Sequence, residues 1–150
     1  MSRIKASVDI DRRPEDVYAY VTDPTHLPEW QESAVKVSRI GGTPGAAGQK
    51  VRVTRHMGRR DIDTDVELTA MDPPRSWHVH GTDGPVRPDL QGTIEPLDNG
   101  TRSRVTFDLD FEGHGIGKAL VPLVVKPAMR KEMARDERHL KEILERGAPA

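Results

Sequence analysis

The most regular pattern of apolar and polar positions lies near the C-terminal end of the chain, over residues 116–146. Apolar side chains recur there mostly at intervals of three or four, which is the period of a helix with one buried stripe. At about 1.5 Å per residue, such a helix is roughly 45 Å long, so its apolar side needs a broad partner surface. The stripe comprises Ile116, Leu120, Leu123, Val124, Met129, Met133, Leu140, Ile143 and Leu144.

Two prolines interrupt this helical pattern in its first half. Pro122 and Pro127 each lack a backbone N–H, so we expect a kink or a break near them. Gly147 suits the end of the helix. Two pairs of opposite charges at a spacing of four are expected to lie together on the solvent-exposed side, namely Glu137 with Lys141 and Glu142 with Arg146.

The N-terminal part of the chain carries signals for one strand and two short helices. Residues 4–10 alternate apolar and polar side chains, which predicts a strand with one buried face. Pro14 suits the first turn of a helix, and Asp23 followed by Pro24 suits the cap and first position of a second one. The side chains expected to face inward from these helices are Val17, Tyr20, Val21, Leu27 and Trp30.

A hairpin is predicted around a two-residue turn at Gly58 and Arg59, after a weak strand over 35–40 and a Gly- and Pro-rich loop over 41–48. Residues whose numbers sum to 117, as 58 and 59 do, then lie opposite one another. The inner face pairs Val51 with Val66, Val53 with Thr64 and Arg55 with Ile62, and the outer face pairs Lys50 with Glu67, Arg52 with Asp65, Thr54 with Asp63 and His56 with Asp61.

A second hairpin is predicted at Asn99 and Gly100, the strongest turn signal in the sequence. The numbers of opposite residues now sum to 199. On the inner face of the sheet this pairs Ile94 with Val105, Gly92 with Phe107 and Leu90 with Leu109, and on the outer face it pairs Glu95 with Arg104. Asp89 and Asp110 would face each other on the outer side, so we expect the register to bulge or to end before them.

One more strand is indicated between the hairpins, where Trp77 and Val79 alternate with His78 and His80 before a turn over 81–85. The predicted order is one strand, two short helices, six antiparallel strands and one long helix. This order predicts an α+β fold in which a curved antiparallel sheet of about seven strands wraps around the long C-terminal helix.

Composition narrows the class of protein. With 150 residues, 23 basic and 24 acidic side chains and a net charge of −1, the chain is expected to form a single domain over 1–150, without a nucleic-acid-binding surface. The absence of cysteine, the lack of a signal-peptide pattern and the absence of long apolar runs predict a cytoplasmic protein without stable membrane insertion. Two Trp, two Tyr and two Phe leave the interior mostly aliphatic.

From about residue 3 to residue 146, the sequence resembles the SRPBCC or START-like superfamily, which has the helix-grip fold and includes the major birch-pollen allergen and the polyketide cyclase/dehydrase group. The features that carry the resemblance are the opening strand, the helix over 14–21, the segment 23–30 with its Leu-Pro-Glu-Trp ending, the strand over 92–94, the turn at 99–100 and the long helix with Pro122. The resemblance implies an apolar cavity between the sheet and the last helix, in which members bind lipids, polyketides or sterols. It carries over no catalytic residue.

Arg55 is the first candidate site residue, because the hairpin register places it on the inner face beside apolar side chains. A buried guanidinium needs an acceptor, so it could hold a carboxylate, enolate or carbonyl oxygen of a ligand. The alternative is that Arg55 reaches solvent at the cavity mouth or pairs with a structural carboxylate. Large inward-facing side chains that could line the cavity, or simply form core, are Trp30, Trp77, Tyr20, Phe107 and Met133, with Thr64 as a polar group.

Two other clusters resemble metal sites only superficially. His78 and His80 point to the same side of a strand, as two ligands of a metal ion would. However, Trp77 and Val79 are expected to face the core, and no third ligand has a recognisable spacing. We therefore expect the two histidines to lie on a solvent-exposed face. Asp61, Asp63 and Asp65 lie opposite a basic strand, which favours cross-strand pairs. We therefore expect no metal site and no cofactor.

The first functional hypothesis is binding or transport of a hydrophobic small molecule. The second is a polyketide cyclase/dehydrase-like enzyme, in which Arg55 would stabilise an enolate and His114 or Thr64 would assist proton transfer. His114 sits in the Gly-rich loop before the long helix, so an ordinary loop histidine is the alternative for it. A third hypothesis is a protein-interaction module of the chaperone-activator type, although the outer sheet face is charged. The sequence does not distinguish between a monomer and a homodimer.

Overall fold

The computed structural model describes residues 3–57 and 59–146 of the chain. A seven-stranded antiparallel sheet has the order β1-β7-β6-β5-β4-β3-β2. Its strands are β1 (Ile4–Ile10), β2 (Ala34–Gly41), β3 (Lys50–Met57), β4 (Arg60–Asp72), β5 (Ser76–Asp83), β6 (Val86–Leu97) and β7 (Arg102–Gly113).

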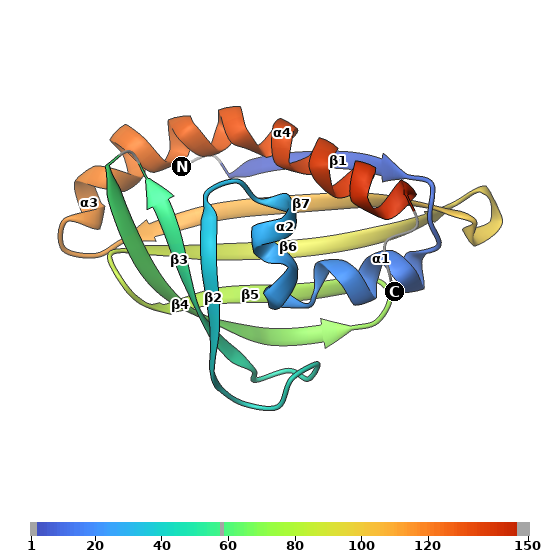
Figure 1. Cartoon of the computed structure of the whole chain (residues 1–150), viewed down its shortest axis with the longest axis horizontal. Helices are drawn as coiled ribbons and strands as arrows, with labels where there is room; N and C mark the ends of the chain where they lie inside the picture. The colour runs from blue at the N-terminus through green and yellow to red at the C-terminus, as the bar shows by residue number, and fades with distance from the viewer. Residues whose placement is uncertain (1–2, 58, 147–150) are drawn as a thin grey trace.

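Short helices follow the first strand, and a long helical segment ends the described chain. The helices are α1 (Pro14–Val21), the 3₁₀ turn η1 (Pro24–His26), α2 (Leu27–Trp30), the 3₁₀ turn η2 (Asp98–Gly100), α3 (Gly117–Leu120), the π-helical turn η3 (Val121–Val125) and α4 (Lys126–Glu145). Figure 1 shows α4 lying along the sheet, with β2 and β3 running across the direction of β6 and β7. The predicted α+β helix-grip architecture is confirmed.

Both predicted hairpin registers are confirmed. In the first hairpin Val53 lies opposite Thr64, and the other pairs that sum to 117 are also formed. Gly58 itself lies outside the described residues. In the second hairpin Ile94 lies opposite Val105 and the pairing sums to 199 throughout. Asn99 and Gly100 have φ values of 59° and 83°, as the two central residues of a type I′ turn require.

The expected break in register at Asp89 and Asp110 was wrong, because β6 and β7 continue to pair through these two residues. Each carboxylate has its own side-chain partners. Asp89 Oδ2 lies 3.1 Å from Arg3 Nη1 and its Oδ1 lies 2.5 Å from His78 Nε2, while Asp110 Oδ1 lies 2.7 Å from Lys126 Nζ. The like charges are therefore compensated by separate partners, and no bulge is needed.

The first half of the C-terminal helical segment differs from the predicted apolar stripe. Ile116, Leu123 and Val124 are 59%, 74% and 44% exposed, whereas Val121 and Val125 are buried. The break expected near Pro122 is present as the π-helical turn η3, whose wider turn changes which side chains face the sheet. Pro127 lies in the first turn of α4, where a proline is tolerated, and Gly147 lies outside the described residues.

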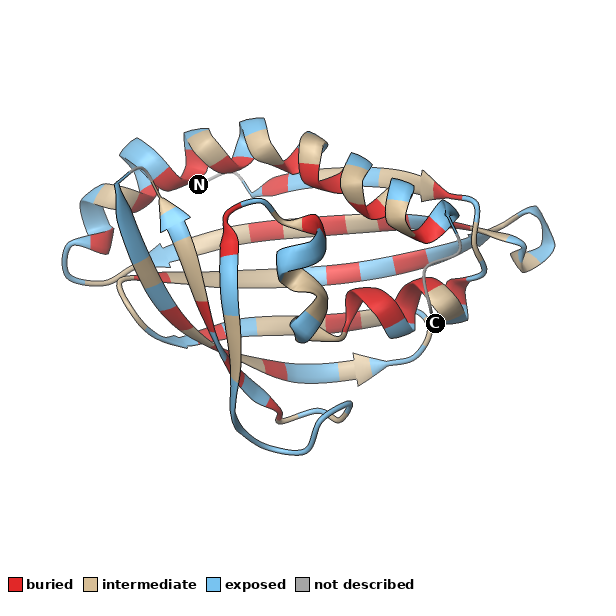
Figure 2. Ribbon diagram, in the orientation of Figure 1, coloured by how far each residue is buried: buried red, intermediate tan, exposed pale blue. Residues whose placement is uncertain are grey.

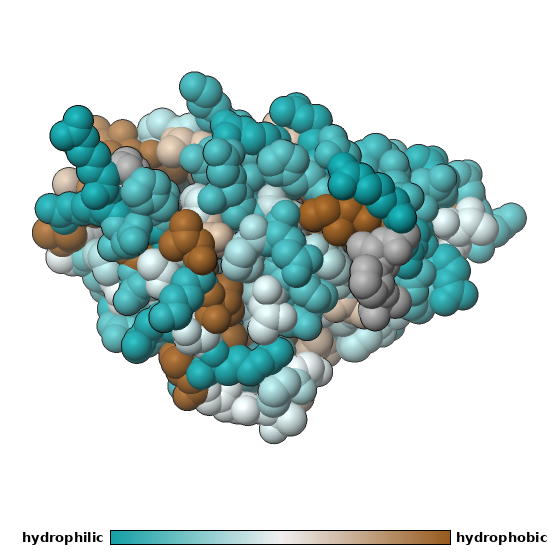
Figure 3. Space-filling model, in the orientation of Figure 1, coloured by the Kyte–Doolittle hydropathy of each residue, from teal (hydrophilic) through white to brown (hydrophobic). Residues whose placement is uncertain are grey.

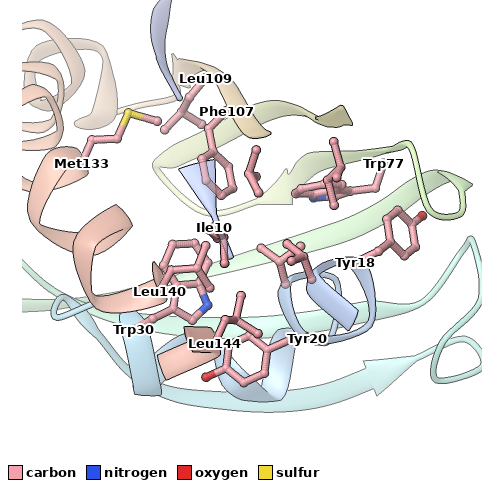
Figure 4. Packing of buried hydrophobic residues seen from close by; sticks show 14 of the residues in the cluster. Ile10, Tyr18, Tyr20, Trp30, Trp77, Phe107, Leu109, Met133, Leu140 and Leu144 are labelled. Carbon is pink, nitrogen blue, oxygen red and sulfur yellow. The ribbon is translucent and has the colours of Figure 1, made fainter. Parts of the chain in front are cut away.

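The main core lies between the concave face of the sheet and α1 and α4. Buried positions alternate along β6 and β7 and follow the side of α4 that faces the sheet (Figure 2). Ile10, Leu140 and Leu144 are among the most deeply buried residues. Figure 4 shows the large side chains of the sheet and helices, including Trp30, Trp77 and Phe107, directed into this shared interior.

Trp77 packs directly over a glycine of the neighbouring strand. Gly92 lies opposite Trp77 in the register, and a Cβ atom at Gly92 would lie 2.3 Å from Trp77 Cε2 and Cζ2. This distance is shorter than any stable contact between carbon atoms. The glycine therefore fixes how close the indole ring can lie to the sheet.

We expect Gly92→Ala to destabilise the fold by about 1–3 kcal/mol, because the added methyl group must displace the Trp77 ring. Gly41→Ala is the control, since its Cβ would have its nearest neighbours 3.9 Å away on the Lys50 side chain. Urea unfolding of both variants measures the difference. Equal free energies of unfolding for the two variants would contradict this contact.

Candidate ligand-binding cavity

A cavity of about 150 Å³ lies between the curved sheet and helices α2 and α4. Its walls are mostly apolar and come from β3 to β7, from the segment that contains α2, and from α4. The larger apolar side chains on the wall are Leu27, Trp30, Met57, Ile62, Leu68, Trp77, Leu90, Phe107, Leu109, Phe111, Met129 and Met133. The polar side chains on the wall are Thr22, Gln31, Gln49, Arg55, Thr64, Asp136 and Glu137.

The structure brings most of the candidate site residues to this one wall. Trp30, Arg55, Thr64, Trp77, Phe107 and Met133 all line the cavity. The aromatic rings contact one another, with ring centroids 5.8 Å apart for Trp30 and Phe107 and 6.1 Å apart for Trp77 and Phe107. Thr64 is buried, and its hydroxyl donates to the backbone carbonyl of Val86 over 3.1 Å. The Thr64 oxygen therefore remains free only as an acceptor.

Tyr20 and His114 do not line the cavity. Tyr20 is buried, but its hydroxyl donates to Glu29 Oε1 over 2.6 Å and its ring stacks on His26 with centroids 4.2 Å apart. Burial and the neighbouring Glu29 carboxylate raise the pKa of the Tyr20 phenol. His114 lies in the turn before α3, where its Nε2 atom is 2.5 Å from Glu112 Oε1.

Arg55 extends from β3 toward the helices. Its Nη1 atom donates to Ser33 Oγ over 3.0 Å. Burial of the guanidinium lowers its pKa, while the nearby carboxylates of Asp136 and Glu132 act in the opposite direction. The cavity thus contains a cation that has a neutral hydrogen-bond partner and two acidic neighbours on α4.

Two adjacent carboxylates of α4 also face the cavity. Asp136 and Glu137 are only 5% and 6% exposed. Burial raises the pKa of Asp136, although a 3.4 Å hydrogen bond from the Glu32 backbone N–H and the charge of Arg55 lower it. Burial alone raises the pKa of Glu137 to about 7. Glu137 Oε2 has no hydrogen-bond partner within the part of the chain that the structure describes.

The expected surface pair of Glu137 with Lys141 was therefore wrong. Lys141 Nζ instead donates to the backbone carbonyl of Asp9 over 2.7 Å and lies 2.6 Å from Glu145 Oε2. The other expected pair is present, with Arg146 Nη2 3.4 Å from Glu142 Oε2.

The sequence did contain a signal for the buried carboxylates. The apolar stripe of the helix has a gap of six residues between Met133 and Leu140, so a side chain at 136 or 137 must face inward. Both of these positions are acidic. Acidic residues in a gap of a buried stripe indicate carboxylates on the inner face.

The outer face of the sheet carries the remaining candidates. His78 Nε2 and His80 Nδ1 lie 2.5 Å and 3.6 Å from Asp89 Oδ1. The three aspartates of β4 form cross-strand contacts, Arg52 with Asp65 at 2.8 Å, Thr54 with Asp63 at 2.6 Å and His56 with Asp61 at 2.8 Å. Within the described residues, no group of His, Cys, Asp and Glu side chains has the arrangement needed to hold a metal ion. None of the described helices combines the length and apolar character needed to cross a membrane.

A curved sheet that encloses an apolar cavity against a long helix defines a helix-grip protein. The family model described as polyketide cyclase / dehydrase and lipid transport matches residues 1–145. The chain therefore belongs to this family. None of the curated proteins compared with it matches the sequence.

Solved structures with the same fold come from several bacteria. The Zhui aromatase/cyclase from a Streptomyces species is 15% identical with a TM-score of 0.79, covering 99% of this chain and 96% of that chain. A protein from Thermus thermophilus is 18% identical with a TM-score of 0.75, covering 97% and 99%. A START superfamily protein from Mycobacterium smegmatis is 15% identical with a TM-score of 0.71, covering 97% and 95%. At these identities the likeness establishes the fold.

We expect the free energy of unfolding to fall as the pH rises from the pKa of Glu137 in the unfolded chain to its pKa in the folded protein. The folded protein holds the proton of Glu137 up to a pKa of about 7, whereas the unfolded chain releases it near 4.5. Proton binding to the folded state therefore stabilises it below pH 4.5, and this stabilisation, up to about 3 kcal/mol, is lost by the time the pH exceeds 7.

Urea unfolding of the wild type and Glu137→Gln at several pH values between 4.5 and 8 tests this expectation. The variant has no titrating group at this position, so the difference in unfolding free energy between the two proteins isolates Glu137. That difference should shift in favour of the variant as the pH rises. Parallel pH profiles would show that the carboxyl group is not buried as described.

Proposed function

We propose that the protein binds a hydrophobic small molecule, such as a lipid or polyketide, in the cavity between the sheet and α4. The observation that carries this proposal is a cavity with mainly apolar walls and a few polar side chains, which is the usual composition of a small-molecule site. Membership of a family described by polyketide cyclase / dehydrase and lipid transport supports it.

In this proposal Arg55 anchors an oxygen of the ligand. Its guanidinium has five N–H donors, and Nη1 is engaged with Ser33 Oγ. A carbonyl or carboxylate oxygen in the cavity would accept from the remaining donors and would restore solvation that burial removes. The aromatic side chains Trp77 and Phe107 would contact the apolar body of the ligand.

One observation favours an enzyme of the cyclase/dehydrase kind as the second candidate. Glu137 has a pKa of about 7 in an apolar cavity that also contains Arg55, so it can gain or lose a proton near neutral pH. Arg55 would then stabilise an enolate, and Glu137 would take the proton-transfer role that His114 and Thr64 are poorly placed to fill. An enzyme would return a chemically altered ligand, whereas a carrier would return it unchanged.

The protein-interaction alternative lacks an observation in its favour. The large apolar side chains that are exposed are Val35, Ile40, Ile116, Leu123 and Val124. Figure 3 shows one face of the molecule as mostly hydrophilic, with apolar residues in small separate patches. Patches of this kind are normal on the surface of a monomeric protein.

We expect Leu90→Trp to lower the affinity for the fluorescent apolar compound N-phenyl-1-naphthylamine at least tenfold, because the larger side chain occupies the cavity. Leu90 lines the cavity, and the next residue, Gln91, is exposed on the other face of β6. Gln91→Trp is the matched control and should bind as the wild type does. Fluorescence titration measures both affinities, and an equal loss in the two variants would contradict binding in the cavity.

We expect Arg55→Met to weaken binding of 2-acetylnaphthalene about tenfold, because a hydrogen bond to a charged group is worth about 1.5–3 kcal/mol. The affinity for 2-methylnaphthalene, which has no acceptor, should stay unchanged. Arg52→Met is the control, since Arg52 lies on the outer face of the same strand and pairs with Asp65. Displacement of N-phenyl-1-naphthylamine measures each affinity, and a loss that is equal for both compounds would refute the anchoring role.

A further inference from the structure

Three buried polar atoms on the cavity wall have no hydrogen-bond partner among the described residues. They are Trp30 Nε1, Gln31 Oε1 and Glu137 Oε2. Trp30 and Glu137 are only 5% and 6% exposed. Buried polar atoms without partners are rare in native proteins, so a cluster of them on a cavity wall indicates a ligand that supplies the partners.

These atoms belong to one region of the wall. Trp30 ends α2 and Gln31 follows it directly, while Glu137 lies on α4. The two helices are joined by the hydrogen bond from the backbone N–H of Glu32 to Asp136 Oδ1, which measures 3.4 Å. Glu32 follows Gln31 in the chain, and Asp136 precedes Glu137. Their hydrogen bond therefore brings the three side chains to the place where α2 and α4 meet.

The chemistry of the three atoms restricts the group that can satisfy them. Trp30 Nε1 is only a donor and needs an acceptor, whereas Gln31 Oε1 and the ionised carboxylate of Glu137 need a donor. A hydroxyl group both donates and accepts. A carbonyl group accepts from Trp30 and from a protonated Glu137, but it has no hydrogen for Gln31 Oε1 or for the ionised Glu137 carboxylate.

An ammonium group fits the three atoms less well. It donates to the oxygen atoms but has no lone pair for Trp30 Nε1, which would stay without a partner. Arg55 would repel such a cation while the carboxylates of Asp136 and Glu137 on the same wall would attract it, so the choice follows from the hydrogen bonds. A hydroxyl group pairs with Trp30 Nε1 and with one of the two oxygen atoms.

We propose that the ligand is an apolar molecule with an alcoholic or phenolic hydroxyl group, which accepts from Trp30 Nε1 and donates to Glu137 Oε2. This inference rests on the proposed ligand-binding function and adds the chemical class of the ligand. The apolar remainder lies against Trp77, Phe107 and Met133, and Arg55 contacts any further oxygen atom.

Matched naphthalene compounds test this hydroxyl site. The dissociation constants of 2-naphthol, 2-methylnaphthalene and 2-(aminomethyl)naphthalene are measured by displacement of N-phenyl-1-naphthylamine. The wild type should bind 2-naphthol at least tenfold more tightly than 2-methylnaphthalene. The hydroxyl and methyl groups are similar in size, so a preference of this size reports hydrogen bonds formed in the cavity.

Glu137→Leu should abolish the preference by weakening the binding of 2-naphthol alone. Glu142→Leu removes a carboxylate from the exposed side of the same helix and should keep the full preference. Trp30→Phe, which removes the N–H group and keeps an aromatic ring, should reduce the preference about threefold. Because the two site variants change different helices, a folding defect in one leaves the other as a test.

Each remaining outcome overturns a specific statement. Equal affinity of the wild type for 2-naphthol and 2-methylnaphthalene would refute the hydroxyl site and leave the ligand-binding proposal intact. Tighter binding of the amine would replace the hydroxyl with a cationic group. If neither the naphthalene compounds nor N-phenyl-1-naphthylamine bound, both the proposed function and this inference would be refuted.

Discussion

The contact between the C-terminal helical segment and the concave face of the sheet is the interaction on which the rest of the structure depends. Leu140 and Leu144 of α4 belong to the main core, whereas Val121 and Val125 of the π-helical turn form a separate cluster with Val86. The cavity lies between the concave face of the sheet and helices α2 and α4. With only two Trp, two Tyr and two Phe in the whole chain, few side chains are large enough to fill that space.

The polar side chains on the cavity wall lower the stability of this contact between helix and sheet. Asp136 and Glu137 occupy helix positions where apolar side chains would stabilise the fold, and burial raises the pKa of both carboxyl groups. Arg55 is placed in the same cavity with Ser33 as its hydrogen-bond partner. Groups that destabilise a core in this way are typically retained for binding or catalysis, where they supply directed hydrogen bonds. In the proposed function, the polar wall is the part of the cavity that would select the ligand by its chemistry.

Local signals allowed much of the fold to be predicted, but the site depends on longer-range packing. The hairpin registers follow from turn residues and alternation alone, so the inner-face position of Arg55 could be predicted correctly. The π-helical turn could not, because Pro122 indicates a break without saying which side chains then face the sheet. Glu137 was misplaced because its spacing to Lys141 suggested a surface pair, whereas Lys141 bonds to the Asp9 carbonyl of β1.

The most direct test of binding between the sheet and α4 is methyl NMR spectroscopy during titration with N-phenyl-1-naphthylamine. Binding in the cavity should shift the methyl signals of Val53, Leu90 and Met133, which line it on opposite sides. The exposed methyl groups of Leu123 and Val124 should not respond. Shifts confined to these exposed residues, or no shifts at saturating concentration, would contradict the existence of an internal ligand site.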